Sequence, residues 1–121
     1  MIKKEKIVKN LQPQALDAEE AVLGSMLTSQ EAVSISIQWL KPSYFYKDAH
    51  SKIFSCMESL FDKGDAVDNL TVVNQLKKNK ELDSVGGAFY VTGLSESVPS
   101  VANVEHYAKI VLEKHILRNL I

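Results

Sequence analysis

The side chains that could carry chemistry are few, and their spacing suits structural roles. The histidines His50, His106 and His115 form no H-E-x-x-H pair and have no partner cysteines, so they do not match the ligand spacing of a zinc site. His50 falls on the apolar face of a predicted helix, where we expect a buried, hydrogen-bonded histidine. The sequence therefore predicts no metal site.

The lone cysteine and two pairs of acidic residues also have structural explanations. Cys56 cannot form an internal disulfide, and beside an apolar helical stripe it behaves as a small hydrophobic residue. Two acidic pairs could act as paired carboxylates in acid–base catalysis: Glu19 with Glu20, and Asp65 with Asp68. Helix starts and turns account for all four acids through capping and dipole effects. We expect no catalytic residue in this chain.

Motifs for nucleotides and nucleic acids are weak or missing. The sequence contains neither a G-x-x-x-x-G-K-[ST] loop nor a G-x-G-x-x-G loop, so we expect no ATP or other cofactor to bind these residues. The aromatic run 44–46 could stack on bases, but only Lys41 and Lys47 flank it. We expect Tyr44, Phe45 and Tyr46 to pack in the core or at its edge.

Apolar residues at helical spacing predict that helices position these side chains. The predicted helices begin near Leu16, Gln30, Asp48 and Asp68, after Gly87, and at either Ser100 or Asn103. Stop signals stand at Lys41-Pro42, Gly64 and Val85-Gly86-Gly87. Asp17 and Glu20 have the polarity of a capping box, and Asp48 and Asp68 are further predicted caps. Gly24 inside the first helix predicts close packing against a neighbouring helix.

Length and composition are those of one globular domain. The chain has 121 residues, of which 45% are hydrophobic and 24% charged, enough for one hydrophobic core without disulfides. The sequence shows no alternating strand pattern and no Asn-Gly or Asp-Gly hairpin turn. Its apolar runs fall far short of the ~20 residues that cross a bilayer. We predict an all-α, compact bundle of about six helices with a long C-terminal helix, in a cytosolic protein.

The charges divide the chain into a basic start and an acidic remainder. The first ten residues contain four lysines and one glutamate, whereas the whole chain has a net charge of -1. We therefore expect a basic, flexible arm at residues 1–12 and a helical domain at 13–121. A surface that mainly neutralises phosphates would carry an excess of basic residues, so tight nucleic-acid binding by this domain alone is disfavoured.

The last predicted helix changes its apolar face along its length. At about 100° per residue, its early apolar residues share one stripe that suits packing on the domain's own core: Val104, Tyr107, Ala108 and Val111. Its later apolar residues spread away from that stripe: Leu112, Ile116, Leu117, Leu120 and Ile121. No glycine or proline follows Leu117. Two compatible explanations are that the later face packs on a continuation of the chain and that it contacts a second subunit, and the alternative is that the end of an over-long helix frays.

Five strings, in this order and with these gaps, resemble the N-terminal domain of bacterial replicative DNA helicases of the DnaB type: DAEEAVLGSML, FYKDAHSKIF, VDNLTVVNQL, VGGAFYVTGL and NVEHYAKIVLEKHILRNLI. The resemblance covers the chain from about Pro13 to Ile121. It implies a piece of a six-membered ring, whose C-terminal domains bind ATP and Mg²⁺ and move along single-stranded DNA. The N-terminal domains form a collar where primase docks, and the last helix continues into a helical hairpin that pairs neighbouring subunits.

The resemblance also suggests residues for these contacts. The family's aromatic residue after a Gly-Gly pair falls on Tyr90, and the Leu-Ile that closes the match falls on Leu120 and Ile121. The candidate subunit and primase interface residues are Tyr90, Leu112, Ile116, Leu117, Leu120 and Ile121. The implied function is a non-catalytic oligomerisation and primase-docking domain of a cytoplasmic bacterial helicase. The alternative is a small stand-alone DNA-binding or adaptor domain, in which the basic arm and Lys77 to Lys80 contact phosphates with a steep salt dependence.

Overall fold

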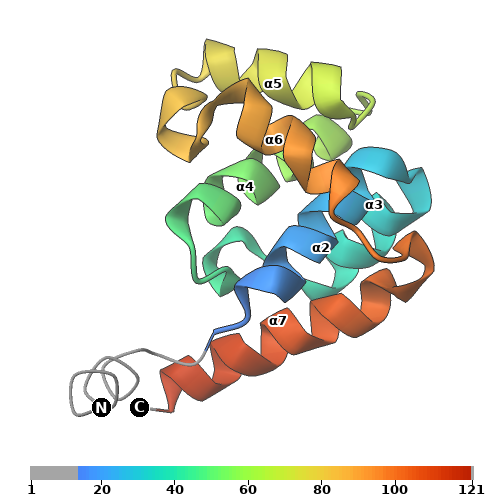
Figure 1. The fold of residues 1–121 in the computed structure, drawn as a ribbon, viewed down its shortest axis with the longest axis vertical. Helices are drawn as coiled ribbons and strands as arrows, with labels where there is room; N and C mark the ends of the chain where they lie inside the picture. The colour runs from blue at the N-terminus through green and yellow to red at the C-terminus, as the bar shows by residue number, and fades with distance from the viewer. Residues whose placement is uncertain (1–13, 121) are drawn as a thin grey trace.

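The computed structural model describes residues 14–120 as a bundle of α-helices without strands (Figure 1). Within this part, six α-helices follow one another: α2 (Leu16–Thr28), α3 (Gln30–Trp39), α4 (Asp48–Asp62), α5 (Asn69–Lys78), α6 (Gly87–Glu96) and α7 (Val104–Asn119). Short 3₁₀ turns lie between them: η1 (Pro42–Tyr44), η2 (Asp83–Val85) and η3 (Val101–Asn103). The predicted all-α class is confirmed. The predicted arm at residues 1–12 lies outside the described residues.

Helix α2 lies at the centre of the bundle, and α3, α4, α6 and α7 pack around it (Figure 1). Most of its side chains are buried, whereas Leu16, Asp17 and Glu20 leave one side of its start at the surface. Val22, Leu23 and Met26 are fully buried there, and Ile53 and Phe54 of α4 are fully buried in the same core. The positions of the surrounding helices therefore depend on α2.

Gly24 lets α2 and α6 approach each other closely, as the sequence predicts. A Cβ atom added at Gly24 would lie 2.1 Å from the carbonyl oxygen of Leu94 and 2.4 Å from Cγ2 of Val98. Both distances are far shorter than a van der Waals contact, and the nearer atom belongs to the backbone of α6. Any larger residue at this position would have to move α6.

Two of the predicted helix caps are wrong. Asp17 and Glu20 form no capping box, because Ala15 occupies the N-cap position of α2. Asp48 is the first residue of α4 and not its cap. The backbone N–H groups just before α4 bond instead to the Glu19 carboxylate, which comes from α2. A contact between distant segments thus replaces the local cap that the sequence pattern predicts.

Other predicted helix ends are confirmed. The side chain of Asp68 accepts the N–H of Thr71 at 2.9 Å, and the Thr71 hydroxyl accepts the N–H of Asp68 at 3.0 Å, so the two form a capping box for α5. Gly64 follows α4 with a φ of 79°, in the left-handed region that favours glycine after a helix. Asn103 occupies the N-cap position of α7 without a side-chain bond. These ends depend on neighbours in the sequence, which explains why the pattern predicts them.

Candidate interaction site

A buried chain of polar contacts connects α2, α4 and α6. Glu19 Oε1 lies 2.7 Å from His50 Nδ1, and His50 Nε2 lies 2.6 Å from the hydroxyl of Tyr90. Glu19 is 2% exposed and His50 is 0% exposed, so water competes little for these bonds. The predicted state of His50, buried and hydrogen-bonded, is confirmed. One carboxylate, one imidazole and one phenol thus tie three helices together.

In this series of polar contacts, each hydrogen bond is donated toward the Glu19 carboxylate. The backbone N–H groups of Tyr46 and Lys47 donate to it at 2.6 and 3.4 Å. With a proton on Nδ1, His50 donates to Glu19, and its Nε2 accepts the O–H of Tyr90. The Lys47 ammonium donates to the Tyr90 oxygen at 3.3 Å and lies 4.7 Å from the centre of its ring. Every member then has a partner, and Tyr90 is held in one position.

Glu19 has a larger role than the predicted one. The sequence places it at the start of its own helix, yet the helix start that it serves is that of α4. Its neighbour Glu20 is half-buried, and Asp65 is exposed in the turn after α4. Since Glu19 and His50 are buried and bonded to each other, this acid–base pair is closed to a substrate. Its physical effect is to position Tyr90.

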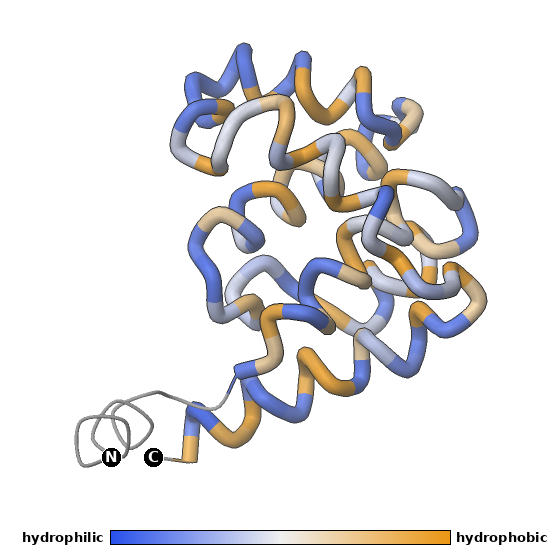
Figure 2. Tube along the Cα trace, in the orientation of Figure 1, coloured by the Kyte–Doolittle hydropathy of each residue, from blue (hydrophilic) through white to orange (hydrophobic). Residues whose placement is uncertain are grey.

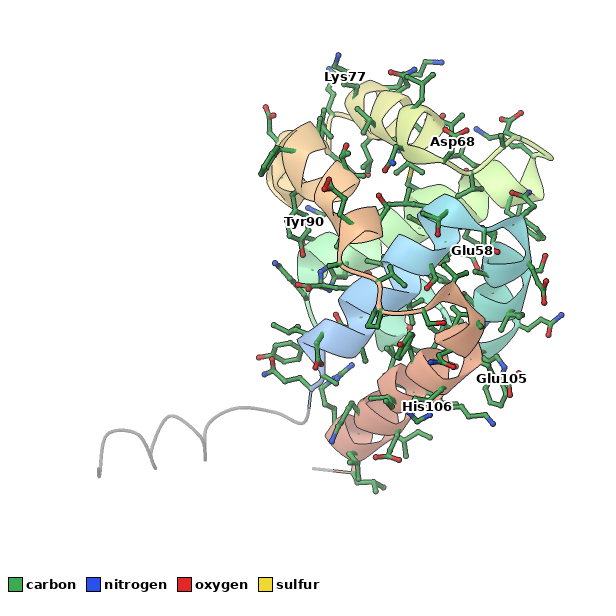
Figure 3. All side chains as sticks on the ribbon, turned by 45° about the vertical axis from the view of Figure 1, so that its right-hand side comes forward. Glu58, Asp68, Lys77, Tyr90, Glu105 and His106 are labelled. Carbon is green, nitrogen blue, oxygen red and sulfur yellow. The ribbon has the colours of Figure 1, made fainter. Side chains whose placement is uncertain are left out.

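Tyr90 lies on the outer side of α6 (Figure 3), beside a hollow of about 440 Å³. Phe89 also lines this hollow and is 94% exposed, although exposed aromatic rings are unfavourable in water. Phe89 is not among the residues that the sequence singles out as candidates. A signal for it exists, because Phe89 lies about 160° from the buried Val91 on the helical wheel of α6.

The last turns of α7 combine apolar and polar residues, as the orange and blue segments near the end of the tube show (Figure 2), and three of the apolar ones are exposed. Ile116 is 49% exposed, Leu117 38% and Leu120 77%. Leu112 differs from these three, because it is half-buried and packs against the core. It lies only about 80° from Val104 on the wheel, at the edge of the inward stripe. Ile121 lies outside the described residues.

The opposite side of these turns is bound to the domain itself. His115 stacks on Tyr44 with ring centroids 4.1 Å apart, and Arg118 donates from Nη2 to the Tyr44 carbonyl oxygen at 2.7 Å. Arg118 also lies 5.4 Å from the centre of the Tyr46 ring. Partial burial, together with the positive charge of Arg118, lowers the pKa of His115 and so favours the neutral ring. These polar contacts with the η1 turn leave the apolar side of α7 facing outward.

Other candidate residues have structural roles. Cys56 is buried, and its burial, with the nearby charge of Glu81, raises the pKa of the thiol to about 11. Phe45 is buried with its ring centroid 5.0 Å from that of Phe54, as expected for core packing. Within residues 14–120, no group of three His, Cys, Asp or Glu side chains is placed to hold a metal ion. In the same range no helix is long and apolar enough to cross a membrane.

The lysine cluster lies away from the exposed end of α7. Lys77, Lys78 and Lys80 are exposed at the end of α5, which lies at the top of the view in Figure 1, whereas α7 lies at the bottom. Figure 3 shows Lys77 pointing away from the bundle. The basic cluster and the apolar face of α7 are therefore separate surfaces.

The chain matches known proteins over nearly its whole length. The family model described as DnaB-like helicase N terminal domain matches residues 11–113. The replicative DNA helicase DnaC of Bacillus subtilis is 45% identical over 111 residues, and the replicative DNA helicase DnaB of Geobacillus stearothermophilus is 43% identical over 109 residues. These matches cover 92% and 90% of this chain but 24% of each relative, so the chain spans about a quarter of their length. The crystal structure of the N-terminal domain of DnaB helicase from Mycobacterium tuberculosis matches with a TM-score of 0.89 and 39% identity, covering 91% of this chain and 79% of that one.

Proposed function

Since the chain belongs to the family of DnaB-like helicase N-terminal domains, we propose that it is the oligomerisation and primase-docking domain of a hexameric, ATP-dependent replicative helicase. Its own residues supply contacts and no catalytic step. The remainder of the helicase would bind ATP and Mg²⁺, act on single-stranded DNA and unwind the duplex at the replication fork in the bacterial cytoplasm. The observation that carries this proposal is the outward apolar face of α7.

This face, formed by Ile116, Leu117 and Leu120, suits a contact between subunits. Apolar side chains that gather on the surface of a single subunit mark interaction sites. Ile116 and Leu117 line a shallow hollow of about 290 Å³, together with the charged Lys109 and Glu113. An apolar centre with a charged rim is the usual composition of a protein–protein interface. Full burial of a leucine contributes about 1.5–3 kcal/mol, so covering Leu120, which is 77% exposed, would stabilise the assembly more than covering Leu117, which is 38% exposed.

Replacing both Leu117 and Leu120 by aspartate in the full-length helicase should weaken subunit association at least about 100-fold. The change removes the further burial of two partly exposed leucines, roughly 2–3 kcal/mol together, and places two charges in the contact. Light scattering over a concentration series measures the mass of the assembly.

Leu70→Asp provides the matched control, because Leu70 is 70% exposed on α5, away from α7. The control variant should assemble like the unchanged protein. Circular dichroism should report the same helix content in all three proteins. A double variant that keeps the full mass at every concentration contradicts the oligomerisation role.

The surface around Tyr90 supports the docking part of the proposal. Its contacts with His50 and Lys47 hold the Tyr90 ring in place before any partner arrives, which lowers the entropy cost of binding. Rigid aromatic residues beside a hollow are frequent binding anchors in protein interfaces. Primase would then contact Tyr90 and its neighbours on α6, while the apolar face of α7 serves subunit contacts.

A further inference from the structure

A groove runs along the outside of α2, between α6 and α7. It consists of two hollows, of about 440 and 420 Å³, which share Glu20 and Ser97 as lining residues. The first hollow adjoins Phe89 and Tyr90 of α6, and the second adjoins Tyr107 of α7. We call this surface the α2 groove.

We propose that the α2 groove binds a basic, amphipathic helix of a partner protein. This inference rests on the proposed docking function, because it gives the chemistry of the segment that docks. Among the described residues, the groove has helical walls and no strand edge, so an extended peptide cannot add to a sheet there. Two adjoining hollows on one line suit the apolar residues that a helix presents on one face at successive turns.

The shape of the groove and its apolar lining suit large apolar side chains on the partner helix. Phe89, 94% exposed at its rim, offers a ring that an apolar partner residue would cover. Gly93 lies in the wall of the same hollow, and a Cβ added there would meet nothing within 4 Å. This open space lets a partner helix approach the backbone of α6. Leu94 in the wall, with Ala18, Ala21 and Ile110 in the second hollow, continues the apolar lining.

The charge of the groove favours a basic partner. In the described part of the chain, the charged residues that line the two hollows are Asp17 and Glu20, both acidic. Lys47, whose ammonium contacts the hydroxyl and ring of Tyr90, places one positive charge near the Tyr90 end, so the acidic part of the groove is the part lined by Asp17 and Glu20. A partner helix with lysines or arginines beside its apolar stripe would therefore meet opposite charge at Asp17 and Glu20, which speeds and orients binding.

The same charges disfavour a second copy of this domain as the occupant. Beyond its first ten residues the chain has ten basic and fourteen acidic side chains. An acidic body that approaches an acidic groove meets repulsion, and like-charge contacts are a common means of excluding a wrong partner. The groove therefore suits a basic segment better than the acidic helical body of a second copy.

Two labelled peptides test the proposal directly with the 121-residue chain. Both are helical, about 18 residues long and share one stripe of leucines, but one carries lysine and the other glutamate at the remaining positions. Fluorescence anisotropy at ~150 mM salt measures their affinities. We expect the lysine peptide to bind at least about tenfold more tightly than the glutamate peptide.

Matched variants locate the binding. Reversing the charge of Asp17 and Glu20 with lysine should remove or invert the preference, whereas the same change at Asp62 and Asp65, which are exposed beside the end of α4, should leave it unchanged. Phe89→Ala should weaken the lysine peptide about tenfold. Leu70→Ala, which removes another exposed apolar side chain, is the control for Phe89→Ala and should leave the affinity for the lysine peptide unchanged. All these positions are exposed or half-buried, so circular dichroism should show an unchanged fold.

Each other outcome overturns the assignment. Equal affinities for the two peptides, no binding of the lysine peptide, or no effect of Phe89→Ala would exclude a basic helix in the α2 groove. A lower mass of the free chain after Phe89→Ala, seen by light scattering, would identify a second copy as the occupant.

Co-sedimentation of primase with the full-length helicase separates the groove assignment from the proposed docking function. If primase binds the unchanged helicase and also the Asp17→Lys, Glu20→Lys variant with equal affinity, the groove assignment fails while the docking function stands.

Discussion

Replacing Gly24 by alanine is expected to lower the free energy of unfolding by about 3 kcal/mol. The added methyl group would lie 2.1 Å from the Leu94 carbonyl oxygen, a backbone atom that cannot move unless α6 moves with it. Insertion of a methyl group into a packed core costs about 1–3 kcal/mol, and a clash with backbone belongs at the upper end. For a domain of this size, the midpoint of thermal unfolding should fall by roughly 10 °C.

Gly93→Ala is the matched control for this prediction. Gly93 also lies inside a helix, but its added methyl group would meet no atom within 4 Å. Alanine favours a helix over glycine by about 0.5–1 kcal/mol, so this change should stabilise the domain slightly. Urea unfolding measures both differences. Equal small effects at the two positions would show that the contact between α2 and α6 is looser than the structure indicates.

Replacing Glu19 by alanine is also expected to destabilise the domain by about 3 kcal/mol. The change leaves His50 Nδ1 and the N–H groups of Tyr46 and Lys47 without their acceptor. His50 is fully buried, and a buried polar group that loses its partner carries its full cost of desolvation. Urea unfolding near neutral pH measures this difference.

The neighbouring Glu20 supplies the control for Glu19. Glu20 is half-buried and lines the α2 groove, so Glu20→Ala should change stability by less than about 0.5 kcal/mol. Glu19→Gln should fall between the two alanine variants, because the amide oxygen can still accept the N–H of Tyr46 at the start of α4. If Glu19→Ala and Glu20→Ala have the same small effect, the buried chain to Tyr90 contributes little to stability.

The helical class and several helix ends could be predicted because they depend on short sequence separations. The capping box of Asp68 with Thr71 spans three residues, and Gly64 ends α4 through its own left-handed conformation. The outward turn of the apolar residues on α7 also follows from positions within one helix. The structure shows three of those residues exposed: Ile116, Leu117 and Leu120.

The buried chain to Tyr90 could not be predicted in the same way. Its links join Glu19 to His50 across 31 residues and His50 to Tyr90 across 40. No local pattern tells which acid will meet which histidine, because the meeting depends on how α2, α4 and α6 cross. The sequence pattern accordingly assigns Glu19 to the start of its own helix, α2. Its carboxylate instead accepts the backbone N–H groups at the start of α4.

Within each helix, the order of apolar and polar residues determines where the helix forms and which of its sides is buried. Both properties follow from the helical period of about 3.6 residues. That order also carries the family resemblance. The packing of the helices then selects which side chains remain outside. Phe89 stays exposed and Leu112 is partly covered, while Arg118 and His115 hold the end of α7 against η1. Burial is a property of the space between helices, and that space exists only after residues distant in the chain have come together.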